Sequence, residues 1–417
     1  MAFTRRQLIQ GGSLLGLGTL VPLRTAWATT TAGGDFRGSV IVSLFLRGAA
    51  DGLSIVPPIG DGRYYDLRPS LALQPPGSGP DAALELDGFF GLHPALAGLI
   101  PFFNNHSLAI VHAAGNPSDS HSHFSAQDFM EGGREDQGSD NTGWLGRHVA
   151  GLDSGNDSAF RVLATGPSVQ KSLNGVVPAF AISDAENFGL NLKNTDPQRV
   201  RETMLELYSW PDEPLDVTTR QTFAAMDILG NLEIPEDPGY PKSALGLSMR
   251  TLAIMIKGGL GVEVAGVDSG GWDHHDNLAT QIEGRLTDLG DSLSTFVEDL
   301  GEEMGRVTIV VMTEFGRRAA ENASLGADHG HGSVMLALGA GVRGGKVYTE
   351  WPGLESQNLY GPGDLGVTTD YRLVLGELLA RRAEHTDLDS VFPGYEMPPY
   401  LGIFNRPRAR KPDTRRD

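Results

Sequence analysis

Five nearly uninterrupted apolar runs, each the length of a β-strand, constrain the fold of this 417-residue chain more than any other feature. A strand with one face in water alternates polar and apolar residues. A strand in a parallel sheet is covered on both faces and is apolar throughout. The runs therefore predict a mainly parallel central sheet in an α/β protein. They cover residues 39–46, 107–112, 262–267, 307–312 and 334–338.

Helical periodicity occupies much of the chain between these runs. A long amphipathic helix is expected at 278–302 and a last helix at 370–382. Several helices are expected within about 195–258, where we find no catalytic signal and predict a helical insertion. Because no internal repeat or long linker interrupts residues 37–405, one α/β domain is expected there. Shorter elements are a helix at 91–100, a helix near 125–130, and strands at 160–164 and 177–182.

The first 28 residues have the features of an export signal. Arg5 and Arg6 precede a glycine-rich apolar run at 8–21, and residues 26–28 form a small-x-small cleavage site. The paired arginines favour the twin-arginine route, with a general secretion signal as the alternative. The twin-arginine translocation machinery is therefore an expected partner, and the expected location is periplasmic or extracellular. The run is too short and glycine-rich to be a stable membrane anchor.

Both ends of the predicted domain are polar. Residues 29–36 are expected to be a flexible linker, and residues 406–417 a basic, disordered tail. A net charge of −19 argues against nucleic acid as a partner. The chain has no cysteine, so a bound metal would need histidine and carboxylate ligands.

The histidines are grouped in a way that suggests a metal site. Six of the 11 histidines lie in three pairs, each close to at least one aspartate. Each pair follows an apolar run, and ligands of α/β proteins bind outside the carboxyl ends of the strands. The three pairs are therefore expected to meet there and hold a divalent cation. They are His121 with His123, His274 with His275, and His329 with His331.

Other polar residues occupy similar positions. Asp51 and Glu314 also come just after apolar runs, although an aspartate before a glycine is more often a turn residue. Ser120 and Ser122 lie in a predicted strand-to-helix turn. There a serine can be a nucleophile or simply cap the helix, and the residues alone leave both interpretations open.

Several motifs resemble one family of exported bacterial proteins, called domain of unknown function 1501, which is placed in the alkaline phosphatase-like superfamily with sulfatases and phosphodiesterases. The motifs are spread over nearly the whole chain. They are the Arg5-Arg6 start and residues 45–53, 122–128, 270–275, 312–317, 328–332, 341–345 and 368–372. The resemblance implies an alkaline phosphatase-like three-layer sandwich with a mainly parallel central sheet and a helical insertion.

The resemblance also implies roles for single residues. The metal ligands would be Asp51, Asp273, His275, Glu314 and His331, with His329 matching less well than His331. Ser122 would be the nucleophile, with His123 beside it as a second catalytic candidate. Phe315 stands where the superfamily has a ligand histidine, so a second metal site would have one ligand fewer. Arg47 and Arg317 are expected either to bind an anionic substrate or to form structural ion pairs.

Taken together, these features predict an exported, metal-dependent hydrolase of phosphate or sulfate esters. Its substrate would be a small anionic ester. One or two divalent ions are expected, with zinc first and calcium, magnesium or manganese as alternatives. The alternative function is a non-catalytic exported binding or assembly protein that keeps the fold.

Overall fold

The computed structural model describes residues 36–136, 138, 140–190, 195–208 and 214–407. The predicted signal peptide at 1–28 lies outside the described residues, as do residues 29–35 of the linker and 408–417 of the tail. No helix in the described ranges is long and apolar enough to span a lipid bilayer.

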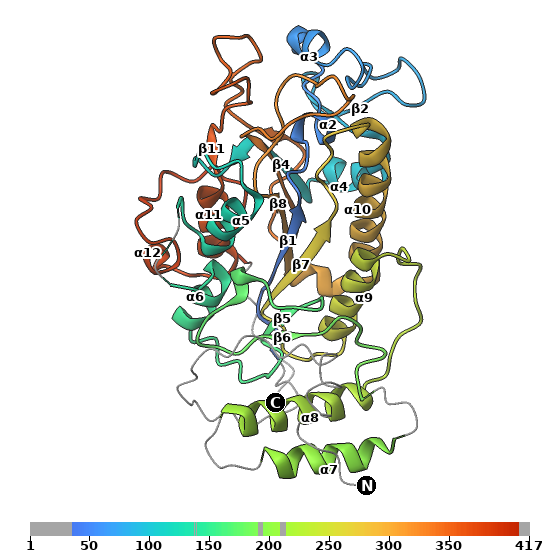
Figure 1. The fold of residues 1–417 in the computed structure, drawn as a ribbon, viewed down its shortest axis with the longest axis vertical. Coiled ribbons are helices and arrows are strands. Elements are labelled where there is room, and N and C mark those ends of the chain that lie inside the picture. The colour runs from blue at the N-terminus through green and yellow to red at the C-terminus, as the bar shows by residue number, and fades with distance from the viewer. Residues whose placement is uncertain (1–35, 137, 139, 191–194, 209–213, 408–417) are drawn as a thin grey trace, which may run out of the picture.

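A nine-stranded sheet runs through the molecule in the order β10-β4-β9-β8-β1-β7-β5-β6, with β11 paired to β4 (Figure 1). Strand β9 is antiparallel to both β4 and β8, and every other pairing is parallel. The prediction of a mainly parallel central sheet is confirmed. The strands are β1 (Val40–Arg47), β4 (Leu108–Gly115), β5 (Val162–Ala164), β6 (Phe180–Ala181), β7 (Val264–Gly270), β8 (Val307–Thr313), β9 (Ser333–Gly339), β10 (Val347–Tyr348) and β11 (Thr369–Asp370).

Helices cover both faces of the sheet, which gives three layers (Figure 1). Side chains of β1 alternate between the two faces, so Val42 and Leu44 pack with the α9 and α10 side, whereas Ile41 and Phe45 pack with the opposite side. The first layer contains α9 (Ala244–Lys257) and α10 (Leu278–Leu300). The other contains α5 (His123–Gly132), α6 (Trp144–Gly151), α11 (Tyr371–Arg382) and α12 (Leu388–Val391).

Helix α10 shows why these segments fold as they do. Its buried residues recur every three or four positions, which places them on one stripe facing the sheet. Each fully buried leucine of such a stripe contributes about 1.5–3 kcal/mol. The helix ends at Leu300 because Gly301 has a φ of +51°, and a 3-10 turn, η4 (Gly301–Arg306), follows.

The predicted helix at 91–100 is wrong at its start. Residues Gly91–Leu92 form β3, which pairs with β2 (Leu84–Glu85) in a separate two-stranded sheet. The helical turn begins only after His93, whose ring accepts a hydrogen bond from the amide of Ala95. It continues as η2 (Pro94–Leu99) and α4 (Ile100–Asn104).

The remaining helices lie mostly away from the centre of the sheet. Helices α7 (Pro197–Leu207) and α8 (Pro214–Gly230) lie at the opposite end of the molecule from α3 (Gly62–Leu67) (Figure 1). With α9 they fall inside the segment predicted as an insertion, and the domain boundaries stay predictions. Short elements are α2 (Gly52–Ile55) and η3 (Lys171–Leu173).

The strand directions decide where a site can form. Strands β1, β4, β7 and β8 run the same way, so their carboxyl ends meet at one edge of the sheet. The loops that follow β4, β7 and β8 carry the three predicted histidine pairs.

Candidate metal centre

Four side chains from three of these loops meet at the carboxyl edge, and we call them the His–Asp cluster: His123, Asp273, His275 and His329. His123 is the first residue of α5, after β4. Asp273 and His275 follow β7, and His329 lies in the loop between β8 and β9. Gly48 allows this approach, since its φ is +121° and a Cβ there would lie 2.7 Å from the amide nitrogen of Asp273.

Three of the four cluster residues have ligand atoms close enough together to share one ion. One atom each of His123, Asp273 and His329 lies within 4.8 Å of the other two. The Asp273 Oδ1 atom is 3.1 Å from His329 Nε2 and 3.0 Å from His275 Nε2, and Oδ2 is 3.4 Å from His123 Nε2. The two Nε2 atoms of His275 and His329 are 3.0 Å apart. One residue of each predicted histidine pair therefore belongs to the cluster: His123, His275 and His329.

The other ring nitrogen of each histidine faces a hydrogen-bond acceptor. Nδ1 of His123 is 2.8 Å from Glu314 Oε1, and Nδ1 of His329 is 2.9 Å from the backbone oxygen of His121. Nδ1 of His275 is 3.4 Å from Asp328 Oδ1. Each Nδ1 can therefore donate a ring proton to its acceptor, because a carboxylate or carbonyl cannot donate. The Nε2 atoms of all three histidines face the Asp273 carboxylate.

Glu314 lies behind His123 rather than in the ring of ligand atoms. Its Oε1 accepts hydrogen bonds from the amide of Gly48 and the side chain of Gln127 as well as from His123, and its Oε2 accepts from Thr313. Burial opposes the ionised form, but the hydrogen bonds outweigh it and keep the pKa of Glu314 below its usual value. The hydrogen bond to Glu314 in turn raises the pKa of His123. Such a carboxylate orients a ligand histidine and makes it a stronger donor.

Asp273 is held by Arg317, which is itself buried. The Nη2 atom of Arg317 is 2.5 Å from Asp273 Oδ1, and the guanidinium also donates to the backbone oxygens of Gly48, Ala49 and Ala327. Burial would raise the pKa of Asp273, but Arg317 and His329 reverse the shift, so its pKa is well below the ordinary value. Asp273 is therefore ionised at neutral pH. Arg317 fixes three loops and has no donor directed to a substrate among these contacts.

Phe315 packs against the histidines instead of binding a metal. Its ring is stacked on His123 with centroids 5.1 Å apart, and lies 5.0 Å from the ring of His329. The side chain is buried. The aromatic ring of Phe315 therefore holds two histidines of the cluster in place.

Ser122 immediately precedes His123 and is the N-cap residue of α5. Its side chain is exposed and makes no capping hydrogen bond. The Ser122 hydroxyl therefore does not cap the helix, which was one of the two roles that the sequence left open.

Asp51, a predicted ligand, lies outside the cluster. Its two carboxylate oxygens are 2.5 and 2.9 Å from the guanidinium of Arg68, and the hydroxyl of Ser54 donates to Oδ2. Asp51 and Arg68 are both buried. Because Arg68 takes up both oxygens, neither is directed to the cluster.

His331 and His274 also point elsewhere. His331 is buried beneath Tyr360, with ring centroids 4.6 Å apart, and burial lowers its pKa. His274 is buried and packs near Trp272. The weaker sequence match, His329, is the residue of its pair that reaches Asp273. Gly330, between His329 and His331, lies against the backbone of Arg317. A Cβ on Gly330 would be 2.3 Å from the carbonyl carbon of Arg317.

Arg47, a predicted substrate-binding residue, is engaged by two acids. Its guanidinium is 3.0 Å from Glu131 and 2.8 Å from Asp268, and it also donates to Gln127. The structure thus places it in a surface ion-pair network at the end of β1.

The sequence marked His121 as a member of a histidine pair and placed Asp328 in a family motif, but their supporting roles, and that of Gln127, were not predicted. Gln127 lies one helical turn after His123 and shares its contact with Glu314, so the i,i+4 spacing was a usable signal. Asp328 and the backbone oxygen of His121 hold the other two histidines. Backbone contacts of this kind leave no trace in residue type.

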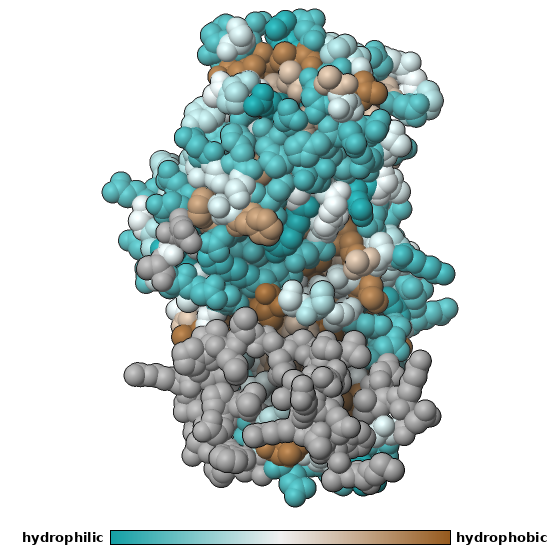
Figure 2. Space-filling view, in the orientation of Figure 1, coloured by the Kyte–Doolittle hydropathy of each residue, from teal (hydrophilic) through white to brown (hydrophobic). Residues whose placement is uncertain are grey.

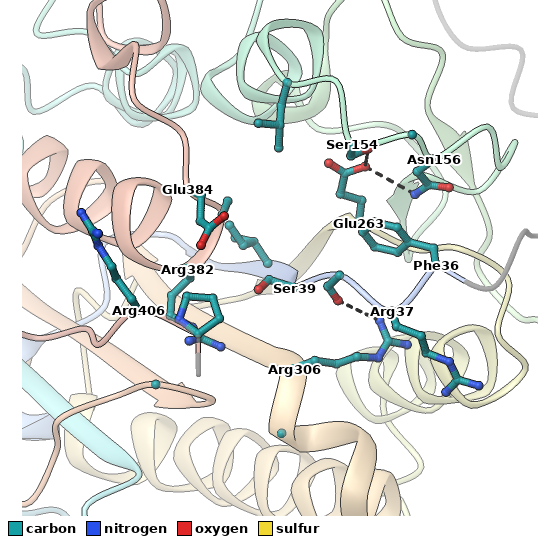
Figure 3. Close-up of a pocket in the computed structure, with 18 of the residues that line it drawn as sticks. Phe36, Arg37, Ser39, Ser154, Asn156, Glu263, Arg306, Arg382, Glu384 and Arg406 are labelled. Atoms are coloured by element: carbon teal, nitrogen blue, oxygen red, sulfur yellow. Dashed lines mark hydrogen bonds between the residues drawn. The ribbon is translucent and has the colours of Figure 1, made fainter. Parts of the chain in front are cut away.

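One hollow in the described structure lies at the opposite, amino edge of the sheet. Its volume is about 1550 Å³, and it is lined by residues preceding β1, β7 and β8, including Ser39, Glu263 and Arg306. Figure 3 shows Arg306, Arg382, Glu384 and Arg406 around it. None of the cluster residues lines this hollow.

The face shown in Figure 2 is mostly hydrophilic where it is coloured, with apolar residues in small separate groups. The most exposed large apolar side chain of the described residues is Phe124, which follows His123 and is 88% exposed.

Comparisons with known proteins give a family and weak structural likenesses. No curated protein matches the chain. A sulfatase, PsFucS1 from Pseudoalteromonas sp., is 10% identical with a TM-score of 0.33. The match covers 74% of this chain and 64% of that chain, so the chain spans less than two thirds of the sulfatase. An alkaline phosphatase from the Antarctic bacterium TAB5 is 10% identical with a TM-score of 0.31, covering 75% of this chain and 94% of that chain.

The family comparison is more extensive. Residues 109–391 match the model of a family described as "Protein of unknown function (DUF1501)", and this range contains β4 except its first residue, β7, β8 and the whole His–Asp cluster. The chain therefore belongs to this family, as its motifs predicted.

Proposed function

We propose that this chain is a metal-dependent hydrolase of phosphate or sulfate esters, with a divalent cation held by the His–Asp cluster. The observation that carries the proposal is the common orientation of His123, His275 and His329. In each ring Nδ1 faces an acceptor, and Nε2 faces Asp273. This is the arrangement found where histidines bind a metal.

The residues fit a cation on two further grounds. The Nε2 atom of His123 is buried and has no hydrogen-bond partner. The Nε2 atoms of His275 and His329 lie 3.0 Å apart, and each is within 3.1 Å of Asp273 Oδ1. With Nδ1 donating in each ring, a cation would take the Nε2 lone pairs of His123 and His329 together with an oxygen of Asp273, with His275 beside them. Three imidazoles and one carboxylate suit zinc, whereas calcium and magnesium prefer oxygen ligands.

A cation bound there would supply positive charge that activates an oxygen nucleophile and stabilises an anionic transition state. Asp273 is already ionised, and Arg317 keeps its carboxylate directed at the three rings. Glu314 and Phe315 fix the orientation of His123. In this proposal His123 is a ligand rather than an acid or base, and Glu314 supports it from behind.

Ser122 is the proposed nucleophile. Its exposed hydroxyl adjoins His123 and lies at the N-terminus of α5, where the helix dipole stabilises negative charge on an attacking oxygen and on an ester anion. The hydroxyl oxygen would attack phosphorus or sulfur and displace the alcohol. Water would then release phosphate or sulfate from the serine.

The proposed substrate is a small anionic ester, met in the periplasm or outside the cell after twin-arginine export. Nucleic acid is not proposed as a partner, since the net charge is −19. Changing both Arg5 and Arg6 to lysine should keep the full chain in the cytoplasm, and fractionation of cells checks this. Unchanged export would point to the general secretion route.

The decisive experiment combines metal analysis with a substrate panel. We expect the purified full chain to hold about one equivalent of metal, and to hydrolyse one or more of a phosphomonoester, a phosphodiester and a sulfate ester. Ser122→Ala should lower kcat by about 10³-fold or more, while the metal content stays the same. Ser120→Ala is the matched control from the same turn and should change kcat by less than about threefold.

The outcomes separate enzyme from binding protein. Metal bound with no hydrolysis of any ester would support the non-catalytic alternative. Hydrolysis that persists in Ser122→Ala would remove the serine from the mechanism and leave the metal site standing.

A further inference from the structure

A second, smaller hollow is lined in part by the loop after β4, which leads to His123 of the His–Asp cluster, although none of the four cluster residues lines it. It has a volume of about 670 Å³, which is in the range of small-molecule sites. Its polar lining comes from the loop after β4, the segment after α5, the loop between β10 and β11, and the start of α11. It includes Ser118, Asp119, Arg134, Glu135, Tyr360 and Arg372.

Two short series of contacts connect the lining of the hollow with the cluster. Asp119 lines the hollow, and His121 is two residues further on, at most about 7 Å along the chain. The backbone oxygen of His121 receives the Nδ1 hydrogen bond of His329. On the other side, Tyr360 lines the hollow and stacks on His331, two residues after His329. On both sides the contacts run from the lining of the hollow through His121 or His331 to the loop that carries His329.

The charges in the hollow do not favour a second anionic group. Its two arginines are already in ion pairs, Arg372 with Asp370 and Glu135, and Arg134 with Asp140 at 2.5 Å. The carboxylates of Asp119, Glu135 and Asp136 outnumber them. Such a lining repels added negative charge and offers many acceptors to hydroxyl groups.

Tyr360 adds an aromatic surface to this polar lining. Its ring is 42% exposed, and its hydroxyl is fixed by a hydrogen bond to Asp119. One face packs on His331, so the ring is held in one orientation. A fixed aromatic ring among hydroxyl-binding groups suits a ring-shaped molecule with apolar C–H faces and polar edges.

We propose that this hollow binds the non-reacting part of the substrate, and that this part is a neutral, hydroxyl-rich ring such as a sugar. The substrate class is then a sugar phosphate or sugar sulfate. This inference rests on the proposed ester hydrolysis at the cluster.

The test compares two esters of equal charge and similar size, a hexose 6-phosphate and n-hexyl phosphate, with the corresponding sulfates if sulfate is the better ester. We expect kcat/KM for the sugar ester to be at least about tenfold higher, because the sugar hydroxyls add hydrogen bonds that the hexyl chain cannot make. Tyr360→Ala should remove most of this preference through KM while changing the hexyl ester by less than about twofold. Tyr360→Phe keeps the ring and should retain most of it.

Two further variants sharpen the test. Arg134→Gln removes donors from the hollow and should lower kcat/KM for the sugar ester by about three- to tenfold. Phe124→Ala is the matched control, because Phe124 is an exposed aromatic residue beside the cluster that does not line the hollow. It should change both esters equally. Equal kcat/KM for the two esters in the wild type, or an equal loss for both in Tyr360→Ala, would overturn the proposal.

Binding measurements keep this test separate from the proposed function. Calorimetry with Ser122→Ala protein should show at least about tenfold tighter binding of the sugar phosphate than of hexyl phosphate. If no ester is hydrolysed but this preference is found, the hydrolase proposal fails and the sugar site stands. If both phosphates bind equally, the sugar site fails whatever the activity.

Discussion

Two aspartate–arginine pairs lie just past the carboxyl ends of neighbouring strands, and they differ in what surrounds them. Asp51 follows β1 and pairs with Arg68, and Asp273 follows β7 and pairs with Arg317. Both arginines are fully buried. The Asp51 side chain is 1% exposed and gives both oxygens to its arginine, whereas the Asp273 side chain is 46% exposed and gives Arg317 only one.

The difference shows how the same two residue types serve two purposes. A buried pair with every oxygen satisfied holds a loop and offers nothing to a ligand. A pair that leaves part of its carboxylate uncommitted keeps an ionised group available to a ligand. In both aspartates burial works against the charged form, and arginine contacts outweigh it and lower the pKa. The contacts of Asp273 with three histidines, rather than its acidity, distinguish it.

The largest effect is expected from Asp51→Asn. The change leaves the buried Arg68 without a carboxylate, so we expect a loss of about 3–5 kcal/mol in the free energy of unfolding. Urea unfolding of the full chain measures this. The double variant Asp51→Leu with Arg68→Met removes both charges and should recover most of the loss. A loss below about 1 kcal/mol in the single variant would contradict a structural role for this pair.

A smaller effect on stability, with a large effect on metal, is expected from Asp273→Asn. Without its central carboxylate the cluster should bind metal about 100-fold more weakly, equivalent to about 2.7 kcal/mol. Metal titration against a competing chelator measures the affinity. The unfolding free energy of the chelated protein should fall by only about 1–2 kcal/mol, since Arg317 keeps its carbonyl contacts. If Asp51→Asn weakened metal binding by a similar factor, the two aspartate–arginine pairs would not differ in their relation to the metal.

The smallest effect concerns acid stability. The folded pKa of Asp51 lies below that of an unfolded aspartate, which is about 3.9. As the pH falls below about 4 the unfolded chain takes up a proton that the folded chain does not, so its stabilising contribution is present above this pH and lost below it. Asp51→Asn should make the dependence shallower by up to about 1.4 kcal/mol per pH unit.

Asp273→Asn should change the same slope less, because its half-exposed pair is screened by solvent. Urea unfolding at several pH values between 3 and 6 gives both slopes. Equal slopes for the two variants would show that burial does not separate the pairs.

Sequence alone could find the region of the site but not its members. The apolar runs placed β1, β4, β7 and β8 correctly, and the histidine pairs after them marked the loops. The sequence did not show which histidine of each pair reaches the cluster. His329 reaches Asp273 while His331 turns beneath Tyr360, and Glu314 supports His123 from behind. These choices depend on loop paths set by distant contacts such as Gly330 against Arg317.

What the sequence by itself determined is local in origin. Continuous apolar runs specify buried strands, spaced leucines specify α10, and the motifs specify the family. What only the tertiary structure decided is which polar groups satisfy one another. Arg68, the C-cap residue of α3, pairs with both oxygens of Asp51. Three loops bring the Nε2 atoms of the histidines to Asp273. Which charged groups pair depends on residues that are separated along the chain. Only the packed fold sets the distances between them.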